Sequence, residues 1–405
     1  MKKIFIQIAS YRDPQLVPTI QSALENAVNP WGLSFGICHQ FSADDAWDSL
    51  AEYTEDPRFR ILAVPFQDSR GACWARSEVQ KLWQGEEYTL QLDSHHRFAE
   101  GWDVALMDML ERAESDKPII TGYIPSFNIE TEERCSKLWA MRPNYDHLRI
   151  ITTFHPEDRA DAGLRKHMFW SGHFMFTFGE YCEEVRYDPD LYFIGEEISM
   201  AVRSWTHGYD MFLPDRNVVW HEYTREGRSK HWGDHTVQNG FETAFHDRDV
   251  VSKERVKALL TGSNLFEYGL GSVRTLEQFE NMSGISFSNS YIAPEAKVNL
   301  SLPDFASSVW KKCTNYRFTC RLDLKAILPR LGRADGFALF VKDTTDTEIY
   351  RKDFSIDAKL PDTLVVTMDS THKPESFMIW MQNYEPFEWL KCTRFPVKDY
   401  DAEKL

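Results

Sequence analysis

Residues 70–98 constrain the fold most strongly, because this stretch passes from a turn to a helix to a strand and ends in polar side chains. Apolar residues recur at helical spacing over residues 72–83, and Gly85 is placed to end that helix. Residues 88–92 are mostly bulky or β-branched, which is typical of a strand. Asp93, Ser94 and His95 follow at once, so the sequence predicts a carboxylate and an imidazole at a strand end.

The same alternation of strand and helix extends through the first 292 residues. Strands are predicted at residues 3–8, 33–38, 58–64, 88–92, 117–123, 170–176 and 217–223. Helices are predicted at residues 16–27, 72–83, 102–110, 195–208, 256–260 and 274–282. Residues 131–166 are charged and irregular, and we expect them to form loops that close over a site. The pattern predicts an α/β fold with a mostly parallel sheet flanked by helices.

The sequence pattern changes at about residue 293. Short runs of alternating hydrophobicity follow, separated by Asp, Pro and Gly turns, at residues 297–302, 316–322, 336–341, 363–368 and 377–381. Such runs are typical of an all-β sandwich. We therefore expect two domains, an α/β domain at residues 1–292 and a β-rich accessory domain at residues 293–405.

The composition excludes several classes of protein. The 405 residues are 42% hydrophobic and 14% aromatic, which supplies a packed core and argues against disorder. The net charge of −16 argues against a general nucleic-acid surface. We recognise no signal peptide and no membrane span, and the 7 Cys residues contain no CxxC pair, which indicates reduced thiols. We expect a cytoplasmic protein without a nucleic-acid or membrane partner.

Asp93 and His95 form a candidate metal site. They lie two residues apart, so their side chains leave an extended strand on the same side. In open α/β sheets ligands bind beyond the carboxyl ends of strands, and a carboxylate with an imidazole suits Mn²⁺ or a similar divalent ion. His221, in the strand predicted at residues 217–223, is the third candidate ligand. The simpler alternatives are a strand-end Asp beside a surface His, and a His221 packed in the core.

Charged residues at predicted helix starts and strand ends indicate an anion or a sugar. Glu196 and Glu197 open a helix after Gly195, although the helix dipole favours carboxylates there without any function. Arginine binds phosphate through two parallel hydrogen bonds, but it is also common on solvated surfaces. The candidates near the predicted ligand edge are Arg12, Arg70 and Arg76.

A small-residue stretch at residues 170–173 is a further candidate. Trp170 offers a ring that can stack on a sugar, and Gly172 lets a ligand approach the backbone. The alternatives are core packing for Trp170 and a strand bulge at Gly172.

Together these motifs resemble a known family, the cytoplasmic UDP-GlcNAc transferases related to the enzyme that adds GlcNAc to hydroxyproline of the Skp1 protein. The resemblance covers roughly residues 1–290, and the layout is also similar to that of the polypeptide GalNAc transferases. It rests on the segments IFIQIASYRDPQL, RGACWARSEVQKLWQG, LQLDSHHRFAEGWD, WSGHFMF, FIGEEISMAVRSWTHGYDMFLP, VVWHEYTR and YGLGSVRTLEQFE.

The resemblance implies a GT-A fold, a retaining reaction and a D-x-H metal motif related to DXD. The implied ligands of Mn²⁺, with Mg²⁺ as the alternative, are Asp93, His95 and His221. Glu196 and Glu197 are the implied catalytic residues, and Glu197 stands where the GalNAc transferases usually carry Asn, so either carboxylate is a candidate. The expected donor-binding residues are Ser10, Tyr11, Arg12, Arg70, Arg76, Asp93, Ser94, Trp170, Gly172, His173 and Tyr223.

We therefore expect a metal-dependent retaining glycosyltransferase. It would move a sugar, GlcNAc by resemblance, from a UDP-sugar to a hydroxyl of a protein, a peptide or a small molecule. Attack by the acceptor hydroxyl from the front face, assisted by the departing phosphate, is implied by the resemblance. Two other functions stay open, a non-catalytic protein that binds sugar nucleotides or glycans and a metal-dependent hydrolase of nucleotide sugars. A homo-oligomer and the role of residues 293–405 are open as well.

Overall fold

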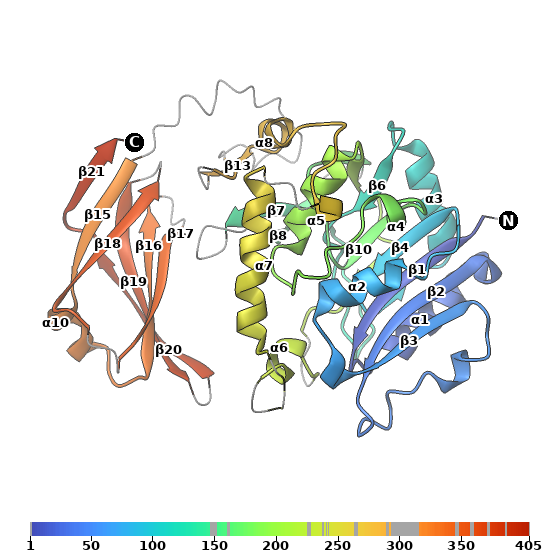
Figure 1. Ribbon diagram of the computed structural model, residues 1–405, viewed down its shortest axis with the longest axis horizontal. Helices are drawn as coiled ribbons and strands as arrows, with labels where there is room; N and C mark the ends of the chain where they lie inside the picture. The colour runs from blue at the N-terminus through green and yellow to red at the C-terminus, as the bar shows by residue number, and fades with distance from the viewer. Residues whose placement is uncertain are drawn as a thin grey trace. The chain divides into compact units, whose positions relative to one another are not determined.

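The computed structural model describes residues 2–145, 152–159, 163–224, 228–236, 239, 241, 243–262, 266–288, 291–292, 316–344, 348–356, 360–370, 373–384 and 387–404. The chain divides into two compact units (Figure 1). Met1–Asn144 and Thr153–Ser283 make up most of the first unit, and Phe305–Leu405 makes up most of the second. The domain boundary expected after residue 292 stays a prediction. No helix among the described residues is long and apolar enough to cross a membrane.

An eight-stranded sheet forms the centre of the first unit, in the order β3-β2-β1-β4-β10-β6-β11-β9. Its strands are β1 (Ile4–Tyr11), β2 (Leu33–Phe41), β3 (Phe59–Pro65), β4 (Tyr88–Leu92), β6 (Pro118–Thr121), β9 (Arg165–His167), β10 (Phe174–Phe178) and β11 (Asp210–Leu213). The first four strands run parallel, whereas β10 runs antiparallel to both β4 and β6. The predicted fold class, a mostly parallel α/β sheet, is confirmed.

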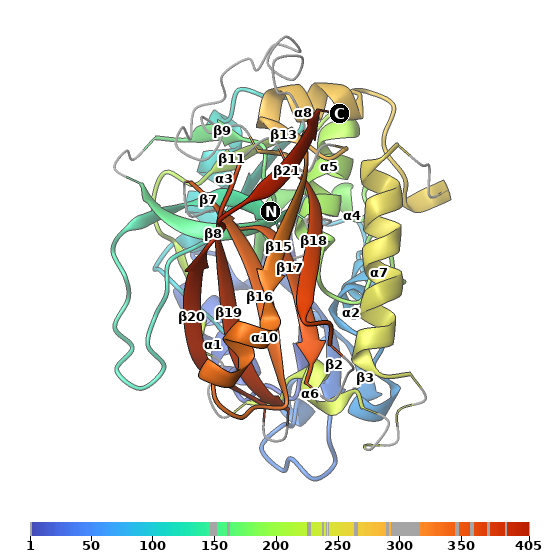
Figure 2. The ribbon, with the colours of Figure 1, turned by 90° about the vertical axis from the view of Figure 1, so that its left-hand side faces the viewer.

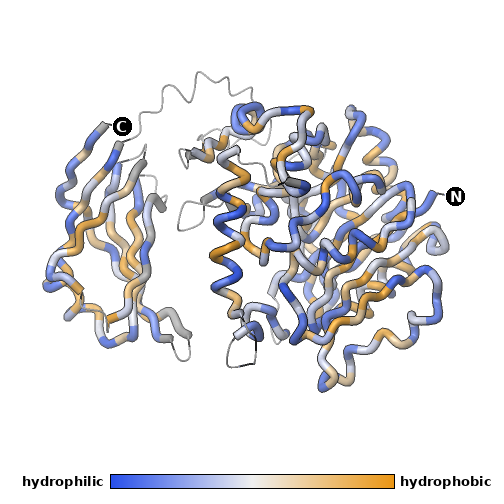
Figure 3. The backbone as a smooth tube through the Cα atoms, viewed as in Figure 1, coloured by the Kyte–Doolittle hydropathy of each residue, from blue (hydrophilic) through white to orange (hydrophobic). Residues whose placement is uncertain are grey.

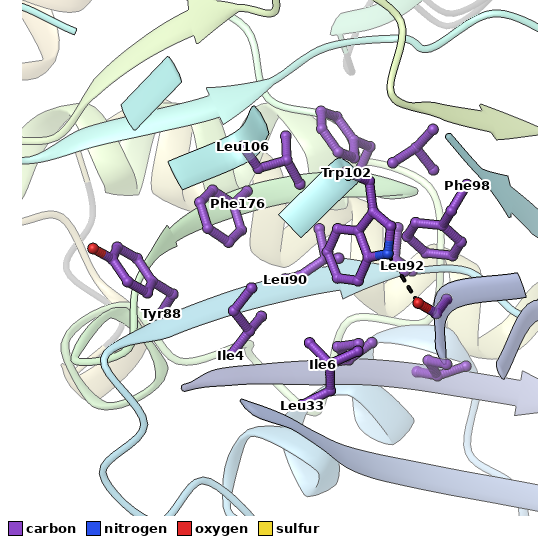
Figure 4. Packing of buried hydrophobic residues seen from close by; sticks show 14 of the residues in the cluster. Ile4, Ile6, Leu33, Tyr88, Leu90, Leu92, Phe98, Trp102, Leu106 and Phe176 are labelled. Atoms are coloured by element: carbon purple, nitrogen blue, oxygen red, sulfur yellow. Dashed lines mark hydrogen bonds between the residues drawn. The ribbon is translucent and has the colours of Figure 1, made fainter. Parts of the chain in front are cut away.

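Side chains alternate along each strand, so every strand contributes residues to both faces of the sheet. Both faces are buried by packed helices. On β1, Ile4, Ile6 and Ile8 join the core on one face with helices α1 (Leu16–Asn26) and α3 (Trp102–Arg112). Phe5 joins a smaller cluster on the other face with α2 (Ala72–Gln80). The indole Nε1 of Trp102 donates to the carbonyl of Ala23 at 2.9 Å and so ties α3 to α1 (Figure 4). The strands of this sheet carry long hydrophobic stretches (Figure 3).

Further short elements surround the sheet. The helices are α4 (Tyr181–Glu184), α5 (Glu196–Thr206), α6 (His231–Asp234), α7 (Phe245–Leu260) and α8 (Leu276–Ser283). The small sheets pair β5 (His96–Phe98) with β12 (Val219–His221) and β7 (Leu138–Tyr145) with β8 (Thr152–Arg159). A further pair, β13 (Ile285–Ser286) with β14 (Tyr291–Ile292), belongs to the second unit. The 3₁₀ turns are η1 (Pro30–Gly32), η2 (Ala51–Tyr53), η3 (Phe66–Asp68) and η5 (Phe266–Tyr268).

Three predictions of secondary structure were wrong in part. Residues 131–166 contain β7, β8 and the start of β9 where loops were expected, because these strands carry charged residues and prolines that hide the strand pattern. The strand expected at residues 170–176 begins only at Phe174. The helix expected at residues 256–260 starts at Phe245, although Val250 and Val251 are exposed and give its first turns no apolar stripe.

The second unit is a two-sheet β structure (Figure 2). One sheet has the order β18-β15-β21 and the other β17-β16-β19-β20. Core side chains come from both sheets, for example Phe318 and Val366 from the first and Leu339 and Ile379 from the second. The strands are β15 (Tyr316–Asp323), β16 (Gly336–Asp343), β17 (Glu348–Ser355), β18 (Thr363–Ser370), β19 (Pro374–Tyr384), β20 (Phe387–Pro396) and β21 (Tyr400–Lys404), with α10 (Leu324–Ile327) and η7 (Leu328–Arg330) between β15 and β16.

The predicted β-rich character of this region is confirmed. The strand expected at residues 297–302 lies outside the described residues.

Candidate functional site

A cavity of about 660 Å³, open to solvent, lies in the first unit at the carboxyl ends of β1 and β4 and the start of α2. Part of this volume is open solvent. Its wall is completed by residues 228–232, just before and within α6. The lining residues are Ala9, Tyr11, Asp13, Gln40, Gly71, Ala72, Arg76, Asp93, Ser94, His95, Phe193, Arg228, Ser229, Lys230, His231 and Trp232.

Asp93, His95 and His221 meet beside this cavity. One ligand atom from each residue lies within 4.8 Å of the other two. Asp93 Oδ2 is 3.8 Å from His95 Nε2 and 3.5 Å from His221 Nε2. Neither Nε2 atom has a hydrogen-bond partner among the described residues, although both are buried. Two imidazole nitrogens without partners that converge on a carboxylate fit a divalent metal of the Mn²⁺ type.

The electrostatics of these residues favour metal binding. Burial alone would raise the pKa of Asp93, but the neighbouring imidazole of His221 and the charge of Arg76 hold that pKa well below its usual value. Burial and the neighbouring His173 hold the pKa of His221 well below the usual value for histidine. The site therefore presents an ionised carboxylate and a neutral imidazole, which are the forms that bind a metal.

His96 and His173 pack against the candidate ligands and lie outside the group of three. The ring of His173 is stacked on that of His221 with centroids 4.4 Å apart, and His96 lies 4.9 Å from His221. His96 Nδ1 is 3.0 Å from the carbonyl of Asp93, and His173 Nε2 is 3.2 Å from the hydroxyl of Tyr223. Tyr223 itself donates to the carbonyl of Ile124 at 2.7 Å. These side chains hold the ring of His221 in place.

Arg76 connects Asp93 to the start of α5. Its Nη2 donates to Asp93 Oδ1 at 2.7 Å and its Nη1 donates to Glu196 Oε2 at 2.6 Å. The thiol of Cys73 also donates to Glu196 Oε2, at 3.1 Å. All these side chains are largely buried, and Arg76 lines the cavity. The sequence placed Arg76 on the nucleotide side, whereas the structure pairs its guanidinium with two carboxylates.

Gly172 lies against this network. A Cβ atom at position 172 would come within 2.4 Å of Glu196 Oε1 and 3.1 Å of Arg76 Nη1. The backbone N–H of Gly172 donates to Glu197 Oε1 at 2.9 Å, and the hydroxyl of Tyr123 donates to Glu197 Oε2 at 2.8 Å. Burial, together with the charge of Glu196, raises the pKa of Glu197 to about 7 against the effect of the Gly172 hydrogen bond. The two adjacent glutamates thus have different partners.

Four of the expected donor-binding residues are buried in the core, paired with other side chains or turned to solvent. Trp170 is fully buried, 6.0 Å from the ring of Tyr187, so its indole does not face the cavity. Arg12 is paired with Asp45 and Asp234. Arg70 is exposed beside the ring of Trp74. The hydroxyl of Ser10 is buried. Trp170, Arg12, Arg70 and Ser10 are not among the residues that line the cavity.

Tyr11 and Ser94 do line the cavity. The hydroxyl of Tyr11 donates to Asp234 Oδ2 at 3.0 Å, and that of Ser94 donates to Asp13 Oδ2 at 2.8 Å. Gln40, Phe193 and residues 228–232 also line it and were missed by the sequence reasoning. The run from Arg228 to His235 combines four basic or imidazole side chains with Trp232, and this density of charged and aromatic residues was the available signal.

Tyr192 anchors this wall. Its hydroxyl is 2.8 Å from His231 Nδ1 and 3.1 Å from His235 Nδ1, and its carbonyl accepts the first N–H of α2 from Ala72. The ring of Phe193 packs 5.5 Å from that of Trp232. The wall and the start of α2 are therefore held together by neighbouring residues of one loop.

Comparisons with known proteins identify the family and the type of fold. Residues 3–58 and 48–289 match the model of a family described as glycosyltransferase (GlcNAc). The crystal structure of GalNAc-T7 with UDP, GalNAc and Mn²⁺ is similar over 98% of this chain and 73% of that chain, with a TM-score of 0.51 and 12% identity. S. aureus TarS 1–349 in complex with UDP-GlcNAc matches over 65% of this chain and 77% of that chain, with a TM-score of 0.37 and 11% identity. No curated protein matches the sequence. At this identity the likeness to GalNAc-T7 concerns the fold alone, and it agrees with the expected GT-A type.

Proposed function

The chain belongs to the GlcNAc glycosyltransferase family, and from that premise we propose that it transfers N-acetylglucosamine from UDP-GlcNAc to a hydroxyl group of an acceptor. The observation that carries the proposal is the cavity at the carboxyl ends of β1 and β4, with Asp93, His95 and His221 grouped at its edge. Ligands of open α/β sheets bind at this edge. The solved GalNAc-T7 complex contains UDP, GalNAc and Mn²⁺, which supports the same class of donor and metal here.

The cavity supplies groups suited to a sugar nucleotide. Asp93, His95 and His221 would hold Mn²⁺, which supplies a positive charge to stabilise the departing diphosphate. Lys230 also lines the cavity and offers a second cation. Gly71, where α2 begins, has a φ of 110° and also lines the cavity, and Tyr192 fills the space that a Cβ at this position would need.

Glu196 and Glu197 are proposed to act on the sugar and acceptor side. Glu196 is held by Arg76 and Cys73, so it stays in one position relative to Asp93. Glu197 holds the backbone of Gly172 and the hydroxyl of Tyr123. Retention of the anomeric configuration, with front-face attack by the acceptor hydroxyl, is part of this proposal, and the acceptor is a hydroxyl of a protein, a peptide or a small molecule.

Release of UDP from a panel of UDP-sugars, with Mn²⁺ or with EDTA, tests the donor and the metal together. We expect release that needs the metal and is fastest with UDP-GlcNAc. Asp93→Asn should abolish it, whereas Asp48→Asn should not. Asp48 is a matched control, because its side chain is 3% exposed and lies 2.7 Å from His39 Nε2, and neither residue lines the cavity.

The outcomes separate the alternative functions. No release with any donor despite tight UDP binding would contradict the proposal and favour a non-catalytic binding protein. Release at a rate that no acceptor changes, with no glycosylated product by mass spectrometry, would favour a hydrolase. Slow release to water alone would not, because transferases also hydrolyse their donors slowly.

A further inference from the structure

We infer that Asp13 is a positioning residue for the metal site, which fixes the tautomer and the orientation of His95 and links that histidine to the cavity wall. The inference rests on the metal site of the proposed function and goes beyond it. An Asp followed by Pro ahead of a helix ordinarily caps that helix. In the structure α1 begins at Leu16, and Gln15 occupies the N-cap position without a side-chain capping bond.

The contacts of Asp13 point toward the metal site. Its Oδ2 atom lies 2.7 Å from His95 Nδ1 and accepts a hydrogen bond from Ser94 Oγ at 2.8 Å. Its Oδ1 atom accepts from the backbone N–H of Gln15 at 2.9 Å. The side chains of Asp13 and His95 are 7% and 8% exposed, so water competes little for this bond. Asp13 lies two residues beyond the end of β1, and His95 lies three residues beyond the end of the neighbouring strand β4.

This contact decides which nitrogen of His95 is available. An ionised carboxylate only accepts hydrogen bonds, so Nδ1 is the nitrogen of His95 that carries a proton and donates to Asp13. The lone pair is then on Nε2, the atom that faces Asp93 Oδ2 at 3.8 Å and has no hydrogen-bond partner among the described residues. Histidines that bind metals typically donate their other ring N–H to a carboxylate or a carbonyl.

Arg228 extends the arrangement to the wall of the cavity. Its Nη1 donates to Asp13 Oδ2 at 2.9 Å, and its Nη2 forms an ion pair with Glu222. Glu222 directly follows His221, and its backbone N–H donates to the carbonyl of His95 at 3.1 Å. Arg228 and Asp13 both line the cavity. The buried carboxylate of Asp13 therefore contacts both His95, a candidate metal ligand, and Arg228 in the cavity wall.

The test measures direct binding of Mn²⁺ to the full chain without nucleotide. Binding is monitored as the loss of the free Mn²⁺ signal in electron paramagnetic resonance. For Asp13→Asn we expect Mn²⁺ affinity to fall by about 10- to 100-fold. Asp48→Asn removes a second buried carboxylate from a histidine at the same 2.7 Å distance, but outside the cavity. Its affinity should stay within about twofold of the wild type, which is the scatter expected for an independent site.

A second measurement reports on the tautomer. In metal-free protein labelled with ¹⁵N in histidine, the wild type should show His95 protonated on Nδ1, and Asp13→Asn should show a mixture of tautomers. If Asp13→Asn does not fold, Ser94→Ala takes its place, because it removes only one hydrogen bond to Asp13. That variant should weaken Mn²⁺ binding by about threefold.

The failures are distinguishable. A wild-type protein that binds no Mn²⁺ would overturn the metal site and this inference with it. A wild type that binds Mn²⁺ with an affinity matched by Asp13→Asn, or by Ser94→Ala where only that variant folds, would overturn the role of Asp13 alone. Equal losses in Asp13→Asn and Asp48→Asn would show a general effect of destabilisation and would also overturn it.

Discussion

Arg76 binds only one of the two carboxylate oxygens of Asp93 and leaves the other facing two histidines. Arg76 Nη2 donates to Asp93 Oδ1 at 2.7 Å, while Oδ2 of the same carboxylate faces the imidazoles of His95 and His221. The arginine therefore sets the rotation of the carboxylate. Because Arg76 also holds Glu196, the candidate metal ligand and the first residue of α5 are fixed to one buried guanidinium.

Replacing Arg76 should therefore cost stability. Arg76→Met leaves Asp93 and Glu196 buried without their cation, and breaking a buried ion pair in this way typically costs about 3–5 kcal/mol. Urea denaturation of the metal-free protein measures this loss. Arg112→Met removes an exposed ion pair with Asp108 and Asp215 and should leave the free energy of unfolding almost unchanged. Equal effects of the two substitutions would contradict this account of Arg76.

His221→Gln should remove metal-dependent activity. A metal ion stabilises transition-state charge by several kcal/mol, so losing it should lower kcat/KM by about 100-fold or more. Mn²⁺ binding and UDP release are the two measurements. His167→Gln is the control, since His167 is equally buried but bonds to the carbonyl of Thr121. Native Mn²⁺ affinity in a folded His221→Gln protein would show that His221 is not a metal ligand.

Gly172→Ala should disturb the network around Arg76. The new methyl group would lie 2.4 Å from Glu196 Oε1, so the carboxylate must move away from Arg76. Overpacking of this kind typically costs about 1–3 kcal/mol. We expect a lower kcat and a lower melting temperature. Gly163→Ala is the control, because a Cβ there meets nothing within 4 Å. Wild-type values for both variants would show that position 172 has room for a side chain.

Glu197 should give the protein a pH dependence. Its pKa is raised from 4.5 to about 7, chiefly by burial. Between these values the folded protein keeps a proton that the unfolded chain has lost, so stability should fall as the pH rises through this range and level off above about 7.

Glu197→Gln carries no titrating carboxyl group at this position. Its curve of unfolding free energy against pH should therefore fall less steeply than that of the wild type. If the ionised form of Glu197 serves the reaction, the wild-type kcat should also rise as the pH passes about 7. Curves of the same slope in denaturation at several pH values would contradict the raised pKa.

Trp170→Phe separates core packing from sugar stacking. The indole is completely buried beside Tyr187, so the substitution should lower stability by about 1–3 kcal/mol through the space it leaves. The KM for the sugar nucleotide should stay close to the wild-type value, because the ring does not line the cavity. A large rise in KM without loss of stability would support the stacking role that the sequence suggested.

The sequence predicted the large sheet well where strands are strongly apolar. The strand predicted at residues 88–92 is β4 with the same bounds, and Asp93 does stand at its end. The strand expected to start at Trp170 was placed too early. Its buried aromatic and small residues look like a strand, but Ser171 forms an isolated bridge to Phe174 and the chain turns between them. In this stretch a buried turn and a strand show the same local sequence pattern of aromatic and small residues.

The group of Asp93, His95 and His221 was predicted as a set, but its geometry was not. No local pattern relates β12 to β4 across the intervening chain, and only the pairing of β12 with β5 brings His221 to His96 and so to its neighbour His95. Asp13 was missed for a different reason. An Asp followed by Pro before a helix is ordinarily read as a helix cap. The contacts of Asp13 with His95 and Arg228 join distant segments, which the local sequence does not reveal.

The reversed direction of β10 has a consequence for how the chain tolerates insertions. Phe174 pairs with Leu92 and Met175 with Gln91, so the distance from Gly172 to Asp93 is set by strand register and not by a loop. A residue added at Gly163, which is exposed and has open space around it, lengthens a connection ahead of β9. A residue added between Gly172 and Phe174 would carry Gly172 away from Arg76 or turn every side chain of β10 to the opposite face. Two neighbouring stretches of sequence should therefore differ sharply in the length variation that relatives of this protein accept.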